Sequence, residues 1–436
     1  MAAQTYNQEL KDHSHDFERQ VHQVGDNVYS AVGFGMANSI MIEGTDGIII
    51  VDTLDCVEAG KLALAQFRKI TDKPVKAVVY THNHQDHVCG VAAYVQAQEV
   101  GKTVDIYGHE KLLGNVVRSN LLLGPITISR GLYMYGRYLP RSDEGYLNDG
   151  LGPDSLFGSP SFLAPNRTFA DTLDVEIAGL KLHMLYVPSE TDDEIAVYLP
   201  DQQLMLTAET INPTFPNCYT IRGTPYRDVH QWFRSIDRLR RYPITAMVPS
   251  HGNPLSGKTH VADIMTAYRD MIQYVHDQAV QLINRGFTAD ELAERIELPE
   301  HLAAIKPYGR EYYGTVKHVV RNIYNGYLGW FNADPATLDP LPPLERARAY
   351  VQLAGGKHHL PHGSADFVAV DVDVGKIVVR SNLLDLAQRV PELGHPAPDL
   401  QSVILLQVGE LEGQRQLYVR RRVGVEPDGE HLDQAG

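Results

Sequence analysis

The sequence predicts an α/β protein whose first part folds as an αββα sandwich. Two stretches, residues 27–80 and 175–248, each consist of short apolar runs separated by turn residues, the pattern of a mainly β meander. Each stretch also contains a helical segment that can cover one face of a sheet. Two meanders with covering helices favour two sheets packed between two helical layers.

The first stretch alternates strands and turns and ends on a buried strand. The turn residues Gly44 and Gly47 indicate a hairpin, and a helix at residues 56–70 leads into the last strand. Strands are expected at residues 27–34, 39–43, 47–52 and 75–80. The second stretch repeats this order, with strands expected at residues 175–179, 181–187, 195–199, 204–207 and 245–248 and a helix at 226–241.

Between the two stretches lies an insertion, residues 108–167, that is rich in Leu, Tyr and Gly and has little periodicity. Long segments of this kind in compact domains are usually lids or pocket walls. The apolar side chains of this insertion either line an apolar channel or pack as ordinary core. They are Leu121, Leu122, Leu123, Ile126, Leu132, Met134 and Tyr135.

The pattern changes to helices after residue 257. An apolar stripe with helical spacing runs from Val261 to Ile283 and ends near Gly286, a residue suited to a helix C-terminus. Thr288 and Glu291 then match a capping box that opens the next helix. A third helix is expected at about residues 310–331. We therefore expect a sandwich domain at 1–257, a helical region at 258–345 and a C-terminal segment of unassigned fold at 346–436.

The composition argues against several classes of protein. The 39 Lys and Arg against 54 Asp and Glu give a net charge of −15, which repels nucleic acid and anionic lipid unless a local patch reverses the field. No apolar run reaches the roughly 18 residues of a membrane span, and the N-terminus lacks the apolar core of a signal peptide. We therefore expect a cytoplasmic protein without membrane spans or nucleic-acid partners.

The strongest chemical signal is the run of His82, His84, Asp86 and His87, directly after the strand at 75–80. Alternate residues of an extended chain project to the same side, so His82 and His84 face one position while Asp86 and His87 turn toward an adjacent one. This arrangement can supply two metal ions about 3.5–4 Å apart. The alternative is a His-rich surface loop, which is disfavoured because four ligand-type residues gather at one strand end.

Two coordination shells need further ligands, and three candidates each follow a predicted strand of the second stretch. They are Glu190, Glu209 and His251. Each also has an ordinary structural alternative. Glu190 can belong to a solvated turn, Glu209 can be a carboxylate at a helix N-terminus, and His251 can be a capped turn residue.

At these residues the sequence resembles the metallo-β-lactamase superfamily, and within it the type III, zinc-dependent alkyl sulfatases. The run at 82–87 is the defining motif of the superfamily. Glu190 and Glu209 stand where most members have His and Asp, and the alkyl sulfatases are similar to this sequence in having Glu at both positions. The resemblance covers roughly residues 15–345 and is further carried by residues 32–44, 71–84 and 217–224.

The resemblance implies a binuclear site with two Zn²⁺ ions per chain. The implied ligands are His82, His84 and Glu190 for one ion, Asp86, His87 and His251 for the other, and Glu209 as the bridge. Asp86 is also assigned as the catalytic residue. A site rich in carboxylates suits a metal-bound hydroxide that attacks an anionic ester.

The same resemblance implies that Asn217 and Arg222 bind the sulfate group. A guanidinium fork suits a tetrahedral oxyanion, although an isolated Arg222 can also be an ordinary surface arginine. We therefore expect a zinc-dependent hydrolase that cleaves alkyl sulfate monoesters. The main alternative is another hydrolase of this fold that acts on lactones, thioesters or phosphoesters. Less favoured alternatives are a di-iron redox protein and a non-enzymatic relative.

The helical region at 258–345 resembles the dimerisation region of the alkyl sulfatases, which implies a homodimer. Residues 308–330 contain five Tyr and one Trp, more aromatic area than a small helical hairpin readily buries. Aromatic enrichment is typical of interface cores. The alternative is that these helices pack on the sandwich of their own chain.

Overall fold

The structure is a computed structural model that describes residues 6–98, 103–156, 158–353, 370–373, 376–379, 404–411 and 414–421. The chain divides into two compact units. The first is Met1–Tyr327 with Val403–Arg422, and the second is Leu328–Ser402 with Val423–Gly436. Both predicted sheets lie in the first unit.

The first sheet has seven strands in chain order, β1 (Gln20–Val24), β2 (Val28–Val32), β3 (Ser39–Glu43), β4 (Ile48–Val51), β5 (Val75–Val79), β6 (Asp105–His109) and β7 (Arg167–Phe169). Strands β1 to β4 pair antiparallel, and β4 to β7 pair parallel. The predicted hairpin joins β3 and β4, where Gly44 N donates to Gly47 O over 2.8 Å. Helix α2 (Val57–Phe67) makes the crossover from β4 to β5 that a parallel pair requires.

The second sheet has six strands in the order β13 (Leu255–Ser256), β12 (Ala246–Pro249), β11 (Leu204–Ala208), β10 (Ile195–Leu199), β9 (Leu180–Tyr186) and β8 (Thr172–Ile177). Only the β11–β12 pair is parallel. Its crossover includes helix α7 (Val229–Leu239), within the predicted helix at 226–241. Both sheets thus place a helix between parallel strands whose carboxyl ends point the same way.

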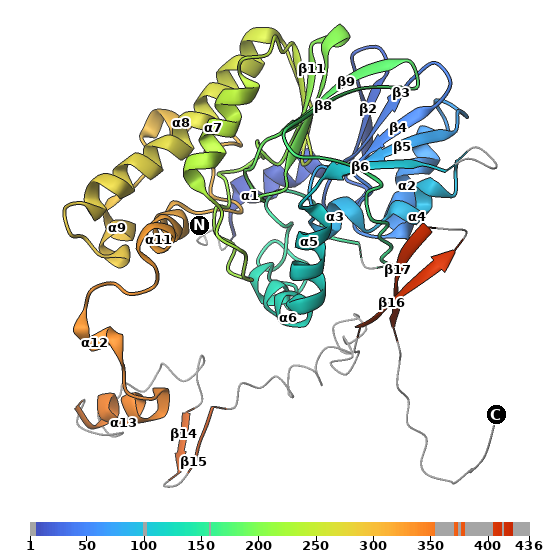
Figure 1. Cartoon of the computed structure of the whole chain (residues 1–436). Helices are drawn as coiled ribbons and strands as arrows, with labels where there is room; N and C mark the ends of the chain where they lie inside the picture. Colours follow the sequence, from blue (N-terminus) through green and yellow to red (C-terminus); the bar gives the residue numbers. More distant parts are fainter. Residues whose placement is uncertain are drawn as a thin grey trace, which may run out of the picture. The chain divides into compact units, whose positions relative to one another are not determined.

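The period-2 alternation of apolar side chains explains the layers. In β3, Ile40 and Ile42 face the core between the sheets, whereas Met41 faces the core under α2. The second sheet supplies Met184 and Val197 to the inner core, and α7 with α8 (Lys258–Ile283) covers its outer face. The predicted αββα sandwich is confirmed, and its helical layers are visible on either side of the sheets in Figure 1.

The insertion contains helices that its sequence did not predict. They are α5 (Leu112–Val116), the π-helix η2 (Val117–Leu122) and α6 (Gly124–Met134). A π-helical turn has a longer period than an α-helix, so the apolar residues on either side of it fall out of a 3.6-residue repeat. The remaining helices of the sandwich are short: α1 (Gln8–His13), η1 (Ser14–Phe17), α3 (Gln85–Val88), α4 (Val91–Val95) and η3 (Pro200–Gln202).

The helices after the sandwich largely follow the prediction. They are α8, α9 (Ala289–Arg295), α10 (Glu300–Ala303) and α11 (Val316–Leu328). The capping box of Thr288 and Glu291 opens α9, and Gly286 has a φ of +87° after α8. Helix α11 begins later than predicted because Arg310 O accepts hydrogen bonds from Phe215 N at 2.7 Å and Thr214 Oγ1 at 2.9 Å. Residues 310–315 therefore lie as irregular chain against the loop at 214–217.

The apolar stripes of α8 and α11 pack within the chain. Tyr268 of α8 and Ile323 of α11 join Trp232 of α7 in one buried cluster. The large aromatic side chains that stay exposed at the end of the region are Tyr327 and Trp330, 52% and 70% exposed. Most apolar side chains of α8 and α11 therefore pack on their own chain, as the alternative to a dimer interface expected.

The second unit contains α12 (Pro335–Leu338), α13 (Pro343–Leu353) and the strand pair β14 (Val370–Asp373) and β15 (Lys376–Val379). A further hairpin, which belongs to the first unit, joins β16 (Ile404–Leu411) and β17 (Gln414–Arg421). Most of the predicted C-terminal segment 346–436 lies outside the described residues. Among the helices that are described, none combines the length and apolarity that crossing a membrane requires.

Candidate metal centre

The candidate ligands lie where strands of both sheets end. His82 and His84 follow β5, and the short helix α3 then carries Asp86 and His87. In the second sheet, Glu209 follows β11 directly, and His251 lies beyond β12. Because β5, β11 and β12 end at one edge of the sandwich, residues far apart in sequence meet there.

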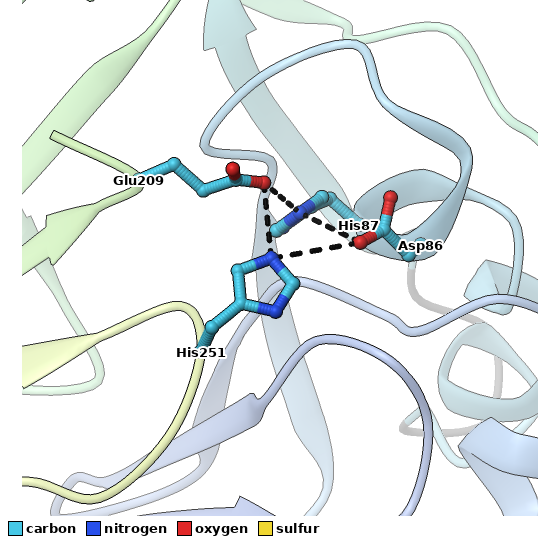
Figure 2. Close-up of side chains that lie close together, drawn as sticks. All are labelled: Asp86, His87, Glu209 and His251. Atoms are coloured by element: carbon cyan, nitrogen blue, oxygen red, sulfur yellow. Dashed lines mark hydrogen bonds and ion pairs between the residues drawn. The ribbon is translucent and has the colours of Figure 1, made fainter. Parts of the chain in front are cut away.

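One group of side chains converges as Figure 2 shows. His87 Nε2 and His251 Nε2 lie 2.9 and 3.0 Å from Glu209 Oε1. The same two nitrogens lie 3.3 and 3.6 Å from Asp86 Oδ2. The four donor atoms are close enough to surround one metal ion.

A second group shares the same carboxylate. His82 Nε2 lies 3.3 Å from Glu209 Oε1 and 3.0 Å from His84 Nδ1. His84 Nδ1 itself lies 4.0 Å from Glu209 Oε1. Glu209 therefore belongs to both groups, which is the position of a bridging ligand.

The hydrogen bonds on the far side of the rings fit metal ligands. His251 Nδ1 lies 3.0 Å from the carbonyl oxygen of Met36, which can only accept, so Nδ1 carries the proton. His87 Nδ1 contacts Asp52 Oδ2 at 2.7 Å in the same way. With Nδ1 protonated, the Nε2 of each ring can bind a metal ion beside Glu209 when it carries no proton. This donor set fits a divalent metal ion.

The charge states of His84 and Glu209 agree with this interpretation, whereas for His87 burial is outweighed by Asp86 and Asp52, which raise its pKa well above the ordinary value. Burial lowers the pKa of His84 to about 3, helped by His82 and Arg222, so this imidazole is neutral as a ligand must be. Burial opposes the ionisation of Glu209, but His251 and its neighbours hold the pKa of that carboxyl well below its usual range. The site therefore combines a neutral imidazole with an ionised carboxylate.

Glu190 lies at the edge of this cluster. Its Oε1 is 4.0 Å from His84 Nδ1 and 2.6 Å from Nη1 of Arg227, in an ion pair whose side chains are both 1% exposed. Its Oε2 has no hydrogen-bond partner within the described ranges. Sequence reasoning missed Arg227, although an arginine within the loop that carries Asn217 and Arg222 was a usable signal.

Arg222 interacts electrostatically with His84 of the cluster, and Asn217 is linked to Glu190 through Arg227. Asn217 lines a pocket together with Tyr135 of the insertion and Tyr313, whose hydroxyls are 3.2 Å apart. Burial opposes the charge of Arg222, but Tyr135 and Tyr313, followed by Glu190, raise its pKa above the ordinary value. The pocket wall is therefore rich in hydroxyl groups, and the cationic Arg222 interacts electrostatically with two of them. The two tyrosines were not predicted as site residues.

Asp52 is a further residue that the sequence did not single out. It is fully buried and accepts hydrogen bonds from Thr81 N and Thr81 Oγ1, both at 2.8 Å, and from Ser250 Oγ at 3.1 Å. It thereby links the chain before His82 to the chain before His251 and orients His87. An Asp at the end of the strongly apolar strand β4 was the available signal.

Comparisons with known families agree with this geometry. The profile of the metallo-beta-lactamase superfamily matches residues 32–251, a span that includes every candidate ligand. A second profile, alkyl sulfatase dimerisation, matches residues 288–409.

Relatives and solved structures point to the same group. A linear primary-alkylsulfatase from Pseudomonas sp. is 50% identical over 328 residues, 75% of this chain and 62% of the relative. The alkyl/aryl-sulfatase BDS1 of Saccharomyces cerevisiae is 33% identical over 77% of this chain and 53% of its own length. The solved structure of the stereoselective inverting sec-alkylsulfatase Pisa1 from Pseudomonas sp. aligns with a TM-score of 0.73 and 30% identity over 78% of this chain and 55% of that chain.

The chain thus spans less than two thirds of the length of these relatives. The superfamily profile nevertheless covers half of the chain, including the strand ends that carry the cluster. The chain belongs to the metallo-beta-lactamase superfamily, and its similarity within that superfamily is to the alkylsulfatases.

Proposed function

We propose that this chain is a metal-dependent hydrolase that cleaves sulfate monoesters of alkyl alcohols. The observation that carries the proposal is the cationic Arg222 beside a cluster in which imidazoles and Asp86 converge on Glu209. The names of the relatives, three of them alkylsulfatases of Pseudomonas, support the same substrate class.

We propose zinc as the metal and two ions per chain. His82, His84 and Glu190 would hold one ion, and Asp86, His87 and His251 the other, with Glu209 shared. Imidazole and carboxylate donors suit zinc. When bound, zinc supplies hydroxide at neutral pH and offsets negative charge on the substrate.

The remaining residues bind and orient the substrate. Arg222 and Asn217 contact the sulfate oxygens, because a guanidinium fork matches a tetrahedral anion in a partly dry pocket. Arg227 fixes Glu190, and its Nη1 also donates to Asn217 O over 2.5 Å. One buried arginine therefore couples the position of a proposed metal ligand to that of a proposed sulfate contact.

Metal analysis combined with a product screen tests the proposal. The purified chain should hold close to two zinc ions, and its zinc form should release sulfate from alkyl sulfates but not hydrolyse lactones or phosphodiesters. His84→Ala should lose most metal at one site and all activity while the chain stays folded. Full activity in a metal-free preparation, or iron with visible colour, contradicts the proposal.

Substitutions of Arg222 test the sulfate contact. Arg222→Ala should reduce turnover of alkyl sulfates by about 100- to 1,000-fold, the cost of removing one donor to a charged transition state. Arg222→Lys should recover little, because an ammonium group does not reproduce the bidentate fork. If both variants turn over alkyl sulfates like the parent, the sulfate contact is misassigned.

We also propose that the chain is a homodimer through its helical region. The match to the dimerisation profile supports this, as do the exposed rings of Tyr327 and Trp330. Light scattering should give twice the 48.6 kDa of one chain. Replacing Trp330 with Glu should shift the mass to that of one chain, and a monomeric parent would refute the dimer.

A further inference from the structure

The insertion carries a concentrated apolar surface. Among the described residues up to Tyr226, eight of the twelve exposed large apolar side chains lie between Leu113 and Leu139. Leu122, Leu123 and Ile126 are 73%, 51% and 56% exposed. We call the insertion surface the exposed side chains of Val117, Leu122, Leu123, Ile126, Ile128 and Tyr133.

The insertion surface continues toward the candidate site. On α6, Ile126, Arg130 and Tyr133 are spaced to share one face. Arg130 Nη2 donates to Ile221 O over 2.6 Å, next to Arg222. Ile221 is itself exposed and also lines the pocket of Asn217. Arg130 therefore connects the exposed face of α6 to a residue that lines the pocket.

The helical part of the insertion, from Lys111 to Arg141, is locally basic. It has five Lys and Arg and no Asp or Glu, in a chain whose net charge is −15. Three of these basic residues pair with acidic residues outside this stretch, Lys111 with Asp192, Arg137 with Asp149 and Arg141 with Asp154. Arg118 and Arg130 are both exposed on the helices of this segment. Basic side chains interleaved with exposed Leu and Ile are the composition of segments that lie on anionic amphiphile surfaces.

We propose that the insertion surface docks on assemblies of an anionic amphiphile, namely aggregates of the alkyl sulfate itself, a substrate class that rests on the proposed function. The apolar side chains enter among the tails, and Arg118 and Arg130 lie at the sulfate headgroups. A second copy of the chain fits less well, because the stretch from Lys111 to Arg141 offers no acidic residue that could pair with Arg118 and Arg130 across a self-complementary contact. Docking brings single substrate molecules from the aggregate to the pocket.

Vesicle sedimentation with the full chain tests the docking. The probe is phosphatidylcholine vesicles doped with hexadecyl sulfonate, whose carbon–sulfur bond a sulfate ester hydrolase does not cleave. The chain should bind doped vesicles and not pure phosphatidylcholine. Failure to bind doped vesicles overturns the proposal, and so does equal binding to vesicles doped with phosphatidylglycerol, which would assign the surface to phospholipid.

Variants locate the docking surface. Each of Leu122→Ser and Ile126→Ser should weaken binding at least about 10-fold, since burying such a side chain gains a tenfold or larger factor. Arg118→Gln should weaken it about 5-fold. The matched control is Leu62→Ser in α2, which is 42% exposed outside the insertion. Equal weakening by the control, or a changed oligomeric mass of Leu122→Ser without vesicles, overturns the proposal.

Hydrolysis of a short, monomeric alkyl sulfate separates the two proposals. The Leu122→Ser and Ile126→Ser variants should hydrolyse it like the parent, because neither residue lines the pocket of Asn217. A parent that binds doped vesicles but releases no sulfate keeps the docking surface and refutes the proposed function. A parent that releases sulfate without binding doped vesicles supports the proposed function and refutes the docking surface.

Discussion

The ligand cluster and the insertion surface differ in burial and in how their side chains are held. The cluster is buried, and its histidines are held from behind, as His87 is by Asp52 and His251 by Met36 O. The insertion surface has apolar side chains exposed to solvent on a π-helix and a short α-helix. The first arrangement fixes atoms relative to one another, and the second leaves apolar area for a partner.

This difference separates residues expected to affect metal binding and stability from residues expected to affect binding of a partner. A substitution in the cluster leaves a buried polar atom without its partner, and such losses are expensive. A substitution on the insertion surface removes contacts that exist only with a partner. We therefore expect large effects on metal content and stability from the first region and almost none from the second.

The largest effect is expected from Glu209→Gln, because Glu209 belongs to both ligand groups. An amide places no negative charge between the imidazoles, so both ions should be weakened together. Activity should fall by at least about 1,000-fold, beyond the 10- to 100-fold typical of residues that only support ligands. Metal quantification with a thermal unfolding scan checks this, and a variant that keeps two ions would remove Glu209 from its bridging role.

The next effect concerns the buried ion pair of Arg227 and Glu190. Arg227→Met leaves a buried carboxylate unpaired and should cost about 3–5 kcal/mol in the free energy of unfolding. The matched control is Lys317→Met, which breaks the exposed pair with Glu294 and should cost at most about 1 kcal/mol. Denaturant unfolding of both variants decides. Equal losses would mean that burial of the first pair has no energetic consequence.

Asp52→Asn should have a smaller effect that appears in metal affinity. Asp52 has a φ of +61°, a conformation that Asn tolerates, so the backbone is kept. The amide can donate where the carboxylate only accepts, which disturbs the tautomer of His87. We expect a 10- to 100-fold loss of metal affinity, roughly the cost of such supporting residues. Competition with a chelator measures the metal affinity. The control is Asp46→Asn in the β3–β4 turn, and equal metal affinities of the two variants would show that Asp52 does not support His87.

The fold was predictable where the hydrophobic period was regular. The alternation in β3 and the apolar run of β4 predicted their strands, and the capping box at Thr288 predicted the start of α9. The helices of the insertion were not predicted, because a π-helix breaks the period by which helices are identified in a sequence. The late start of α11 reflects hydrogen bonds that Thr214 and Phe215 donate from almost 100 residues earlier, and no local pattern contains them.

The site was predictable to the extent that its chemistry is concentrated in one segment. The run from His82 to His87 is dense enough to indicate a metal site by itself. Arg227 and Asp52 act through partners far away in the sequence, and Tyr135 meets Tyr313 across 178 positions. Single residues of common types carry no signal of such contacts until the sheets bring them together. The assignment of Glu190 as a ligand stays a prediction.

The smallest effect is expected on the insertion surface, and one chemical change made in both regions measures the contrast. Ile49 in β4 is fully buried in the core between the sheets, whereas Ile126 is 56% exposed. Ile49→Ala should lower the free energy of unfolding by about 2–5 kcal/mol, through lost transfer energy and the cavity left behind. Ile126→Ala removes the same atoms where they have few neighbours, so its effect should stay within about 0.5 kcal/mol. Denaturant unfolding of the two variants provides the comparison. A loss above about 2 kcal/mol for Ile126→Ala would show that this side chain is held by contacts within its own chain, and the surface would then have no apolar area free for an amphiphile.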